Sequence, residues 1–336
     1  MKLWREVLAG ILHTRLDSII SIIALGLAVA FIPVLWLKIF LFLVIAFSVF
    51  KVIESVYKLQ KEKHVPLAVV IFGDQAMRNS FVDDCLRQMA KLRFDETALR
   101  HLGIGRDDWC LYQSGDLPTS TNQWRRVVQE FRGKLEFIRA KLEGPEYFHI
   151  FLKCRTALVF GLGATMGTWG NVILYQEDSS GSFKPVIYLD NKTDLPNHHA
   201  THSIKKRLEP PYEFIHPNIP KKLTSPTIVA LNLAGHSPGA YVRSEARRRN
   251  LSSVMIDNTY GNNLTEKYWL RPAQEVTSVL LQLLAQGIEL EIYASCPNGL
   301  AFAIGMALGD QCPVTVFHWF SDKKVYKPVL KLNNLY

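Results

Sequence analysis

Apolar residues are concentrated near the N-terminus, in a block over residues 18–50 that contains one charged residue, Lys38. A single helix over this block would be about 50 Å long, which exceeds the ~30 Å hydrocarbon core of a bilayer. Pro33 and Lys38 provide a break near its middle. The pattern therefore predicts two membrane spans, at about 14–33 and 35–56.

Basic residues flank both ends of this block, and such residues favour the cytoplasmic side of a membrane. We therefore expect a membrane hairpin over residues 1–58 whose two ends both lie in the cytoplasm. A signal peptide fits poorly, because the apolar block is too long and lacks a small-residue cleavage site. The domain that follows, residues 64–336, is expected on the same side.

In this following domain, short apolar runs typical of buried strands alternate with segments of helical spacing. The predicted strands are residues 66–73, 171–176, 183–190, 227–233, 289–295, 313–319 and 325–332. Helices are predicted over residues 124–142 and 273–286, whereas 101–122 is loop-like. Strands that alternate with helices indicate an α/β fold with a mostly parallel sheet covered on both faces.

A proline-rich segment divides the domain. Repeated prolines make residues 191–226 a linker without long regular elements. It separates a first half, residues 66–190, from a second half, residues 227–336.

The two halves carry similar segments, since residues 148–167 and 290–309 match at a constant offset of 142. The matching pairs are Cys154 and Cys296, Leu158 and Leu300, Phe160 and Phe302, Gly163 and Gly305, and Gly167 and Gly309. Residues 184–191 and 327–334 also match, at an offset of 143. A repeat this long indicates duplication of a half-domain. Each copy predicts a strand, a polar turn and a helix whose glycines allow close packing on the sheet.

The order of elements over residues 289–332 is a strand, a turn, Leu-Ala-Phe-x-x-Gly-x-x-x-Gly, a strand and Tyr-Lys-Pro-x-x-x-Leu. This order resembles the SAVED domain of bacterial anti-phage signalling (CBASS), and the resemblance covers roughly residues 66–336. It implies two fused Rossmann-like (CARF-like) halves. It also implies a cyclic oligonucleotide ligand, of three or four nucleotides, made by a partner nucleotidyltransferase.

Together with the predicted hairpin, the resemblance implies an effector of the transmembrane-SAVED type. Such a protein would be multi-pass in the bacterial inner membrane, with its sensor domain in the cytoplasm. We expect it to form a ligand-induced homo-oligomer that contacts membrane lipid and disrupts the membrane. No DNA or RNA substrate is expected.

The net charge of +9 favours anionic partners such as nucleotides or phospholipid headgroups. The five cysteines are odd in number and form no Cys-x-x-Cys pair, which argues against a disulfide scaffold or a zinc ribbon. His198, His199 and His202 lie in the linker with no cysteine near, so a metal site is not expected. We expect neither a metal nor a cofactor.

The segment Gly235-His236-Ser237-Pro238-Gly239 matches the Gly-x-Ser-x-Gly elbow of serine hydrolases. In that elbow the residue after the serine donates its N–H to the oxyanion, but Pro238 has no N–H. Loss of one such donor costs about 3 kcal/mol of transition-state stabilisation. We therefore expect no catalytic residue. A membrane-associated hydrolase using Ser237 and a membrane-anchored protein-binding scaffold remain the alternatives.

The strongest candidate site is a crevice at the carboxyl ends of the strands, where helix N-termini present free N–H groups. Four turns of this kind occur, two in each half, at residues 73–79, 153–156, 234–241 and 295–299. Duplication predicts that they frame one crevice suited to phosphates and bases. The predicted ligand-binding residues are Gln75, Arg78, Lys153, Arg155, Thr156, His236, Ser237, Tyr241, Arg243, Ser295, Asn298 and Gly299.

Overall fold

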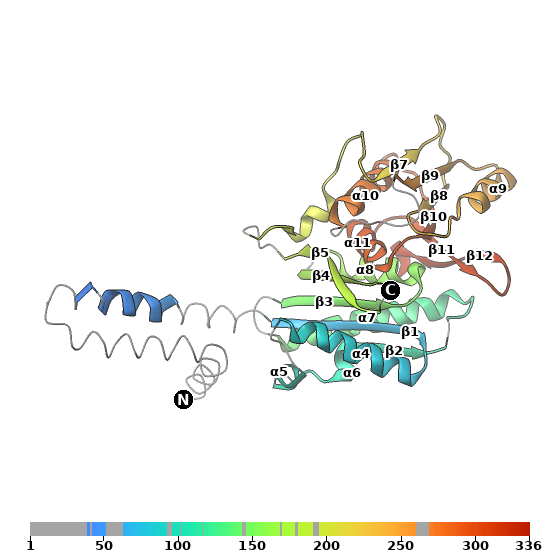
Figure 1. The fold of residues 1–336 in the computed structure, drawn as a ribbon. Coiled ribbons are helices and arrows are strands. Elements are labelled where there is room, and N and C mark those ends of the chain that lie inside the picture. The colour runs from blue at the N-terminus through green and yellow to red at the C-terminus, as the bar shows by residue number, and fades with distance from the viewer. Residues whose placement is uncertain are drawn as a thin grey trace. The chain divides into compact units, whose positions relative to one another are not determined.

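The computed structural model divides the chain into two compact units, Met1–Lys63 and His64–Tyr336. The residues it describes are 39–40, 42–51, 63–92, 96–101, 103–115, 117–142, 146–168, 170–178, 181–190, 195–259 and 269–336. The first unit contributes one described helix, and the second contains two β-sheets with their helices (Figure 1).

The described helix of the first unit covers residues 39–40 and 42–51. Among the described residues, no helix combines the length and the apolar character needed to cross a membrane. The prediction of a multi-pass inner-membrane protein is therefore wrong. The other residues of the two predicted spans lie outside the described residues.

The second unit consists of two halves and the segment between them. The first half contains β1 (Lys63–Gly73), α4 (Gln75–Ala90), α5 (Glu96–His101), α6 (Arg106–Trp109), β2 (Cys110–Ser114), α7 (Thr121–Lys141), β3 (Glu146–Lys153), α8 (Thr156–Met166), β4 (Asn171–Glu177) and β5 (Phe183–Leu189). The intervening segment contains β6 (His198–His199), η1 (Thr201–Lys205) and β7 (Ile215–Asn218). The second half contains β8 (Thr227–Asn232), α9 (Gly239–Arg249), β9 (Ser253–Asn258), α10 (Leu270–Leu284), β10 (Leu290–Ser295), α11 (Asn298–Leu308), β11 (Val314–Phe320), β12 (Val325–Lys331) and η2 (Leu332–Asn334).

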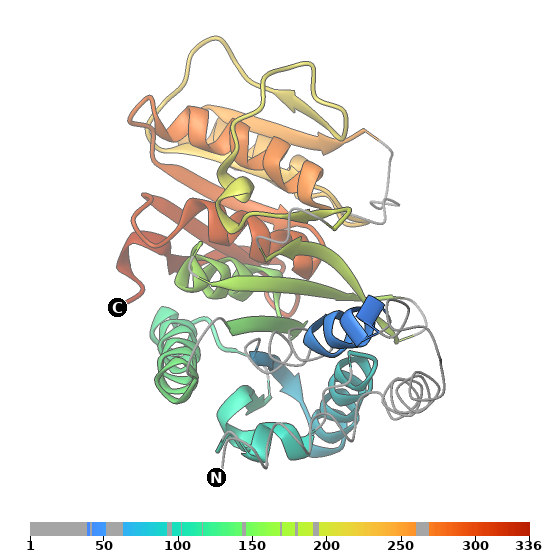
Figure 2. The ribbon, with the colours of Figure 1, turned by 90° about the vertical axis from the view of Figure 1, so that its left-hand side faces the viewer.

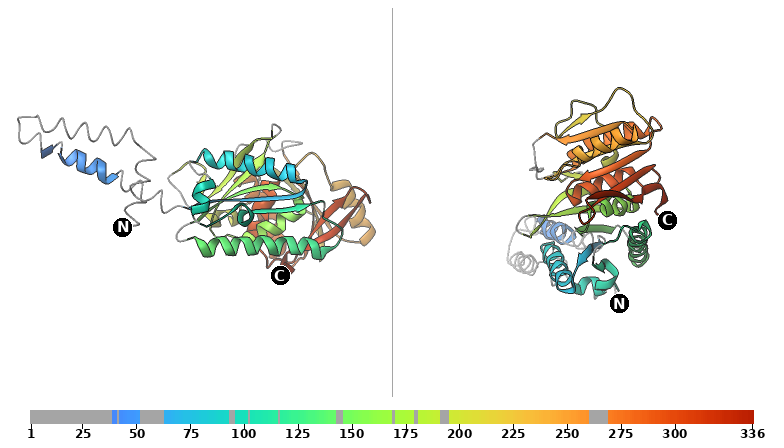
Figure 3. Two further views of the ribbon diagram at one scale, coloured as in Figure 1. Left: turned by 90° about the horizontal axis from the view of Figure 1, so that it is seen from below. Right: turned by 90° about the vertical axis from the view of Figure 1, so that its right-hand side faces the viewer.

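Each half has its own six-stranded sheet, in the orders β2-β1-β3-β4-β5-β6 and β12-β11-β10-β8-β9-β7. Inner neighbours such as β3 and β4, or β8 and β10, are parallel, whereas β4–β5, β11–β12 and β7–β9 are antiparallel. The α/β class is confirmed, and the two mixed sheets are consistent with two fused CARF-like halves. In the first half, α4 and α7 cover opposite faces of the sheet (Figure 3).

Several segments differ from the predicted elements, and neither α4 nor β9 was predicted. Residues 101–122, predicted as loop-like, contain α6 and the edge strand β2, which runs parallel to β1. Only Cys110 and Leu111 of β2 are buried, so its apolar signal is short. The linker adds one short strand to each sheet, because β6 pairs with β5 and β7 pairs with β9.

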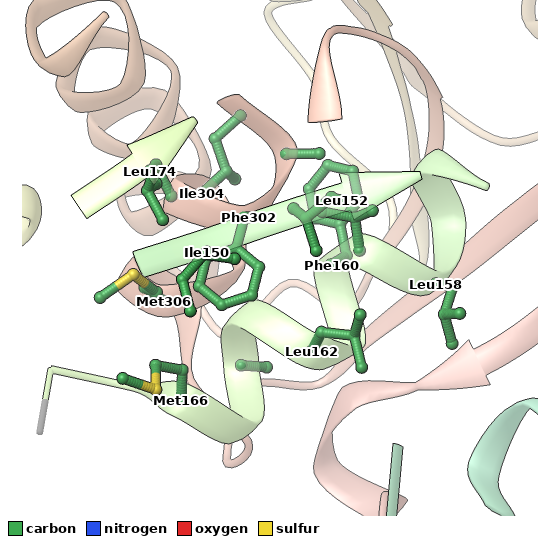
Figure 4. Packing of buried hydrophobic residues seen from close by; sticks show 14 of the residues in the cluster. Ile150, Leu152, Leu158, Phe160, Leu162, Met166, Leu174, Phe302, Ile304 and Met306 are labelled. Atoms are coloured by element: carbon green, nitrogen blue, oxygen red, sulfur yellow. The ribbon is translucent and has the colours of Figure 1, made fainter. Parts of the chain in front are cut away.

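The repeated helices α8 and α11 lie side by side at the junction of the two halves (Figure 2). Nearly every residue of each helix is buried, as expected for a helix that is apolar on all sides. A Cβ on Gly163 would lie 2.1 Å from the Phe302 carbonyl oxygen, and one on Gly305 would lie 2.4 Å from that of Phe160. The glycines therefore permit the two helix backbones to cross, rather than packing on the sheet as predicted. Phe160 and Phe302 belong to the buried cluster around the crossing (Figure 4).

Candidate functional site

The N-termini of α8 and α11 meet at equivalent positions of the repeat. Helix α8 begins at Thr156 and α11 at Asn298, and Thr156 Oγ1 lies 3.4 Å from Asn298 Oδ1. Asn298 Nδ2 donates a hydrogen bond to the Cys154 carbonyl over 3.0 Å. In return, the Thr156 hydroxyl donates to the Cys296 carbonyl over 3.3 Å. Each half thus holds the turn of the other, and the two helix N-termini are fixed beside each other.

A cavity of about 830 Å³ opens beside these two turns. The first half contributes Cys154, Arg155, Thr156, Ala157 and Gln176 to its lining. The second half contributes Ala234, His236, Ser237, Pro238, Ala240, Tyr241, Ala294, Ser295, Cys296, Pro297, Asn298, Phe317, His318, Trp319 and Tyr326. The volume lies in the upper part of the range of about 300–1,000 Å³ that is usual for ligand pockets.

The electrostatics of this cavity favour an anion. Three helices, α8, α9 and α11, begin at its wall, and helix N-termini carry partial positive charge. Arg155, the residue that precedes α8, adds a full positive charge. No aspartate or glutamate is among the described residues that line the cavity. Phosphate groups are the anions that such helix N-termini commonly bind in proteins.

One side of the cavity is aromatic. We call the side chains of Tyr241, Phe317, Trp319 and Tyr326 the aromatic wall. The ring centroids of Tyr241 and Tyr326 are 4.9 Å apart, and those of Trp319 and Tyr326 are 5.1 Å apart. Burial raises the pKa of Tyr326. Of these residues the sequence predicted only Tyr241. The available signal was the alternation of Phe317 and Trp319 on one face of a predicted strand.

Comparison with known families gives one match. Residues 198–332 match the SAVED family. Its full description is "SMODS-associated and fused to various effectors sensor domain". No curated protein matches the chain. The SAVED match includes α9, α11 and the aromatic wall, whereas Arg155 and Thr156 lie before it.

Solved structures of SAVED receptors share the fold. One is the Acinetobacter baumannii Cap4 SAVED/CARF-domain receptor with the cyclic trinucleotide 2′3′3′-cAAA, at a TM-score of 0.52 and 12% identity. Another is the same receptor with 3′3′3′-cAAA, at a TM-score of 0.51 and 11% identity. Both matches cover 86% of this chain and 56% of the receptor, so the chain spans little more than half of the receptor's length.

Seven of the predicted ligand-binding residues line the cavity: Arg155, Thr156, His236, Ser237, Tyr241, Ser295 and Asn298. Three of the four predicted turns, residues 153–156, 234–241 and 295–299, therefore meet at one place. The contact of these residues with a ligand stays a prediction.

The fourth predicted turn, at residues 73–79, contributes none of the described residues that line this cavity. Arg78 pairs with Asp107 over 2.7 Å and lies with its guanidinium 5.3 Å from the centre of the Tyr112 ring. Gln75 donates to Asn79 over 3.2 Å. Both predicted residues thus make contacts within the first half.

Lys153, Arg243 and Gly299 are also absent from the described lining. Lys153 forms an ion pair with Glu177 over 3.1 Å. The N–H of Gly299 donates over 3.2 Å to Gln176 Oε1, and Gln176 itself lines the cavity. Arg243 lies one turn into α9 and is exposed.

Ser237 makes hydrogen bonds that organise the start of α9. Its hydroxyl donates to Asn232 Oδ1 over 2.8 Å and accepts from the N–H of Gly239 over 3.2 Å. In a serine hydrolase this hydroxyl donates to a histidine instead. His318 lines the same cavity, but its ring lies against Trp124, with centroids 5.2 Å apart. These two hydrogen bonds of Ser237 therefore suit a structural role.

The cysteines are free thiols, and Cys154 and Cys296 are buried at the cavity wall. Burial raises the pKa of both thiols, which keeps them protonated and weakly nucleophilic. His198 pairs with the buried Asp190, with Nδ1 2.6 Å from Oδ2. Within the described ranges, no three His, Cys, Asp or Glu residues are grouped so that they could hold a metal ion.

Proposed function

We propose that the chain is a receptor for a cyclic oligonucleotide, which binds in the cavity between the two halves and is not chemically changed there. The observation that carries the proposal is the meeting of the α8 and α11 N-termini beside Arg155, in a cavity without a lining carboxylate among the described residues. A ring of phosphates needs several such positive positions close together.

The comparisons support the ligand class. The SAVED family is described as a sensor domain, and the Cap4 receptors of similar fold are described with cyclic trinucleotides. We therefore propose a cyclic trinucleotide such as cAAA, supplied by a partner nucleotidyltransferase.

Thermal denaturation of the whole chain tests the proposal. A ligand that binds only the folded state stabilises it by about 2.7 kcal/mol at a concentration of 100 Kd. We expect 3′3′3′-cAAA or 2′3′3′-cAAA to raise Tm, whereas linear triadenylate does not. If neither cyclic trinucleotide nor a cyclic tetranucleotide changes Tm, the proposed function is wrong.

A pair of variants locates the site. Arg155→Glu should weaken binding by about 1.5–3 kcal/mol, the usual value of a charge-assisted hydrogen bond. Arg132→Glu, on the exposed face of α7, is the control of equal charge change and should leave the affinity unchanged. Equal losses in both variants would mean that only net charge is sensed.

We also propose that ligand binding favours an oligomer. A ligand whose exposed face contacts a second copy of the chain binds the oligomer more tightly than the monomer and shifts the equilibrium accordingly. Light scattering with and without 3′3′3′-cAAA measures this shift. An unchanged molar mass at saturating ligand would contradict it.

A further inference from the structure

The two halves carry the same arrangement of three aromatic rings. The first triad is Phe151, Tyr175 and Phe183, and the second triad is Tyr293, Phe317 and Tyr326. The register of the antiparallel strand pairs establishes the correspondence. The ladder shifts between Leu174 and Tyr175 in the first half, and between Val316 and Phe317 in the second.

Ring geometry confirms that the two triads correspond. Phe151 stacks on Tyr175 with centroids 4.3 Å apart, and Tyr293 stacks on Phe317 at 4.4 Å. The third ring meets the stack edge-on in each half, with Phe183 at 5.3 Å from Phe151. The matching distance from Tyr326 to Tyr293 is 5.1 Å.

The first triad is sealed. Its three rings are all buried, and Phe81 of α4 packs edge-on against Phe183 with centroids 5.2 Å apart. The residue opposite Phe183 across the strand pair is Glu177, which is bound to Lys153. In the first half, therefore, the three rings are part of the core, and the position opposite Phe183 holds an ion pair instead of an aromatic side chain.

The second triad is open towards the cavity. The residue opposite Tyr326 across the strand pair is Trp319, whose side chain is part of the cavity lining and is 38% exposed. Tyr241 of α9 takes the place that Phe81 has in the first half, and it also lines the cavity. Among the described rings that form or contact the two triads, Trp319 is the exposed one.

We infer that one base of the cyclic oligonucleotide stacks on Trp319 of the aromatic wall, and that the described residues of the first half offer no equivalent stacking surface. The inference rests on the proposed function and specifies which half reads a base. Proteins that bind single-stranded nucleic acid combine a positively charged groove with aromatic side chains on which bases stack. A purine has the larger stacking area, so adenine suits this place.

Affinity measurements test the inference with 3′3′3′-cAAA as the ligand. Trp319→Ala should weaken binding about 5- to 150-fold, the usual effect when a base loses its aromatic partner. Trp319→Phe keeps a ring and should retain most of the affinity. Phe137→Ala is the matched control, because Phe137 is a 42% exposed aromatic residue on α7 outside the cavity lining.

Fluorescence gives a second readout that does not depend on affinity. Trp319 is the one tryptophan among the described residues that line the cavity, so stacking of adenine should quench part of the emission. At saturating ligand, this quenching should disappear in Trp319→Phe although the ligand is bound.

The outcomes separate the inference from the proposed function. If Arg155→Glu weakens binding but Trp319→Ala equals wild type, the stacking inference is wrong and the receptor function stands. Quenching that persists in Trp319→Phe would also contradict the stacking inference alone. If the unmodified chain binds no cyclic oligonucleotide, both are wrong.

Discussion

Helices α4 and α9 occupy equivalent places in the two halves, yet they contribute differently. Helix α4 buries Phe81, Val82, Cys85 and Met89 against the first sheet. Helix α9 is shorter, ends in three arginines and buries only Gly239, Val242 and Ala246. In the first half, therefore, the helix at this position completes the core, whereas in the second half the start of the helix lines the cavity.

This difference shows which parts of a duplicated fold can diverge. The helix crossing at Gly163 and Gly305 and the reciprocal bonds of Thr156 and Asn298 are present in both copies. These features position the cavity from both sides. The side chains that cover the aromatic triads do not position the cavity in both copies, so this region can be closed in one copy and open in the other.

The largest expected effect comes from the two triads. Phe183→Ala should lower the free energy of unfolding by about 3–5 kcal/mol, because a fully buried ring leaves a cavity. Tyr326→Ala, at the half-exposed equivalent position, should cost less than half as much. Urea unfolding of both variants measures the difference. Equal losses would mean that the two triads are buried alike.

The helix crossing should respond to substitution equally from both sides. Gly163→Ala and Gly305→Ala should each lower the free energy of unfolding by about 3 kcal/mol or more, the upper end of the usual cost of overpacking. The reason is that the added Cβ meets a backbone carbonyl, which cannot rotate away. Gly133→Ala in α7, where the Cβ meets nothing within 4 Å, should instead stabilise by about 0.5–1 kcal/mol. Thermal unfolding compares the three, and a stable Gly163→Ala would contradict the crossing.

The reciprocal hydrogen bonds predict a smaller and unequal effect. Asn298→Ala removes the 3.0 Å bond to the Cys154 carbonyl and should cost about 1 kcal/mol. Thr156→Val removes the longer 3.3 Å bond and should cost less. Urea unfolding of both variants measures the loss of unfolding free energy caused by the removal of each hydrogen bond. A larger loss in Thr156→Val than in Asn298→Ala would contradict the expected order of the two hydrogen bonds.

The smallest expected effect comes from a segment that only the first half has. Helices α5 and α6 lie between α4 and β2, whereas in the second half the equivalent connection from α9 to β9 is residues 250–252. Hydrogen bonds from Arg106 and, less strongly, Arg100 lower the pKa of Glu96 from 4.5 to about 2. Since the folded pKa is the lower one, the stabilisation is present above pH 4.5 and is lost as pH falls towards 2. Arg106 is 43% exposed, so the effect should be about 1 kcal/mol or less.

Acid titration of stability in wild type and Glu96→Gln measures this contribution. The two curves should differ at neutral pH and converge near pH 2. Parallel curves over the whole range would show that the ion pair does not stabilise the folded state.

Much of the fold could be predicted because the repeat has a strong local signal. Helices α8 and α11 are apolar on all sides and end at Gly167 and Gly309, both with positive φ, which a glycine tolerates. Strands β1, β4, β5, β8, β10, β11 and β12 also lie close to their predicted ranges. By contrast, β2 is short and has few buried residues, so its signal was too weak.

The lining of the cavity was predicted in part, and the role of its residues in binding a ligand stays a prediction. The turns around Arg155, Ser237 and Asn298 follow predicted strands, and the α/β topology brings them together. Trp319 lies within a predicted strand, and only the pairing with β12 and the openness of the second half place it at the cavity. Lys153 and Arg78 were predicted for their charge, but their partners Glu177 and Asp107 are distant in sequence.

The helix crossing also has a consequence for synthesis. Thr156 and Asn298, where α8 and α11 begin, are 142 residues apart in the chain. At about 5–20 residues per second, α11 leaves the ribosome roughly 7–30 s after α8. During this interval α8, an apolar helix without a polar face, lacks α11, the helix that crosses it in the folded protein. The nascent chain should therefore be a substrate for chaperones until the second copy of the repeat has been translated.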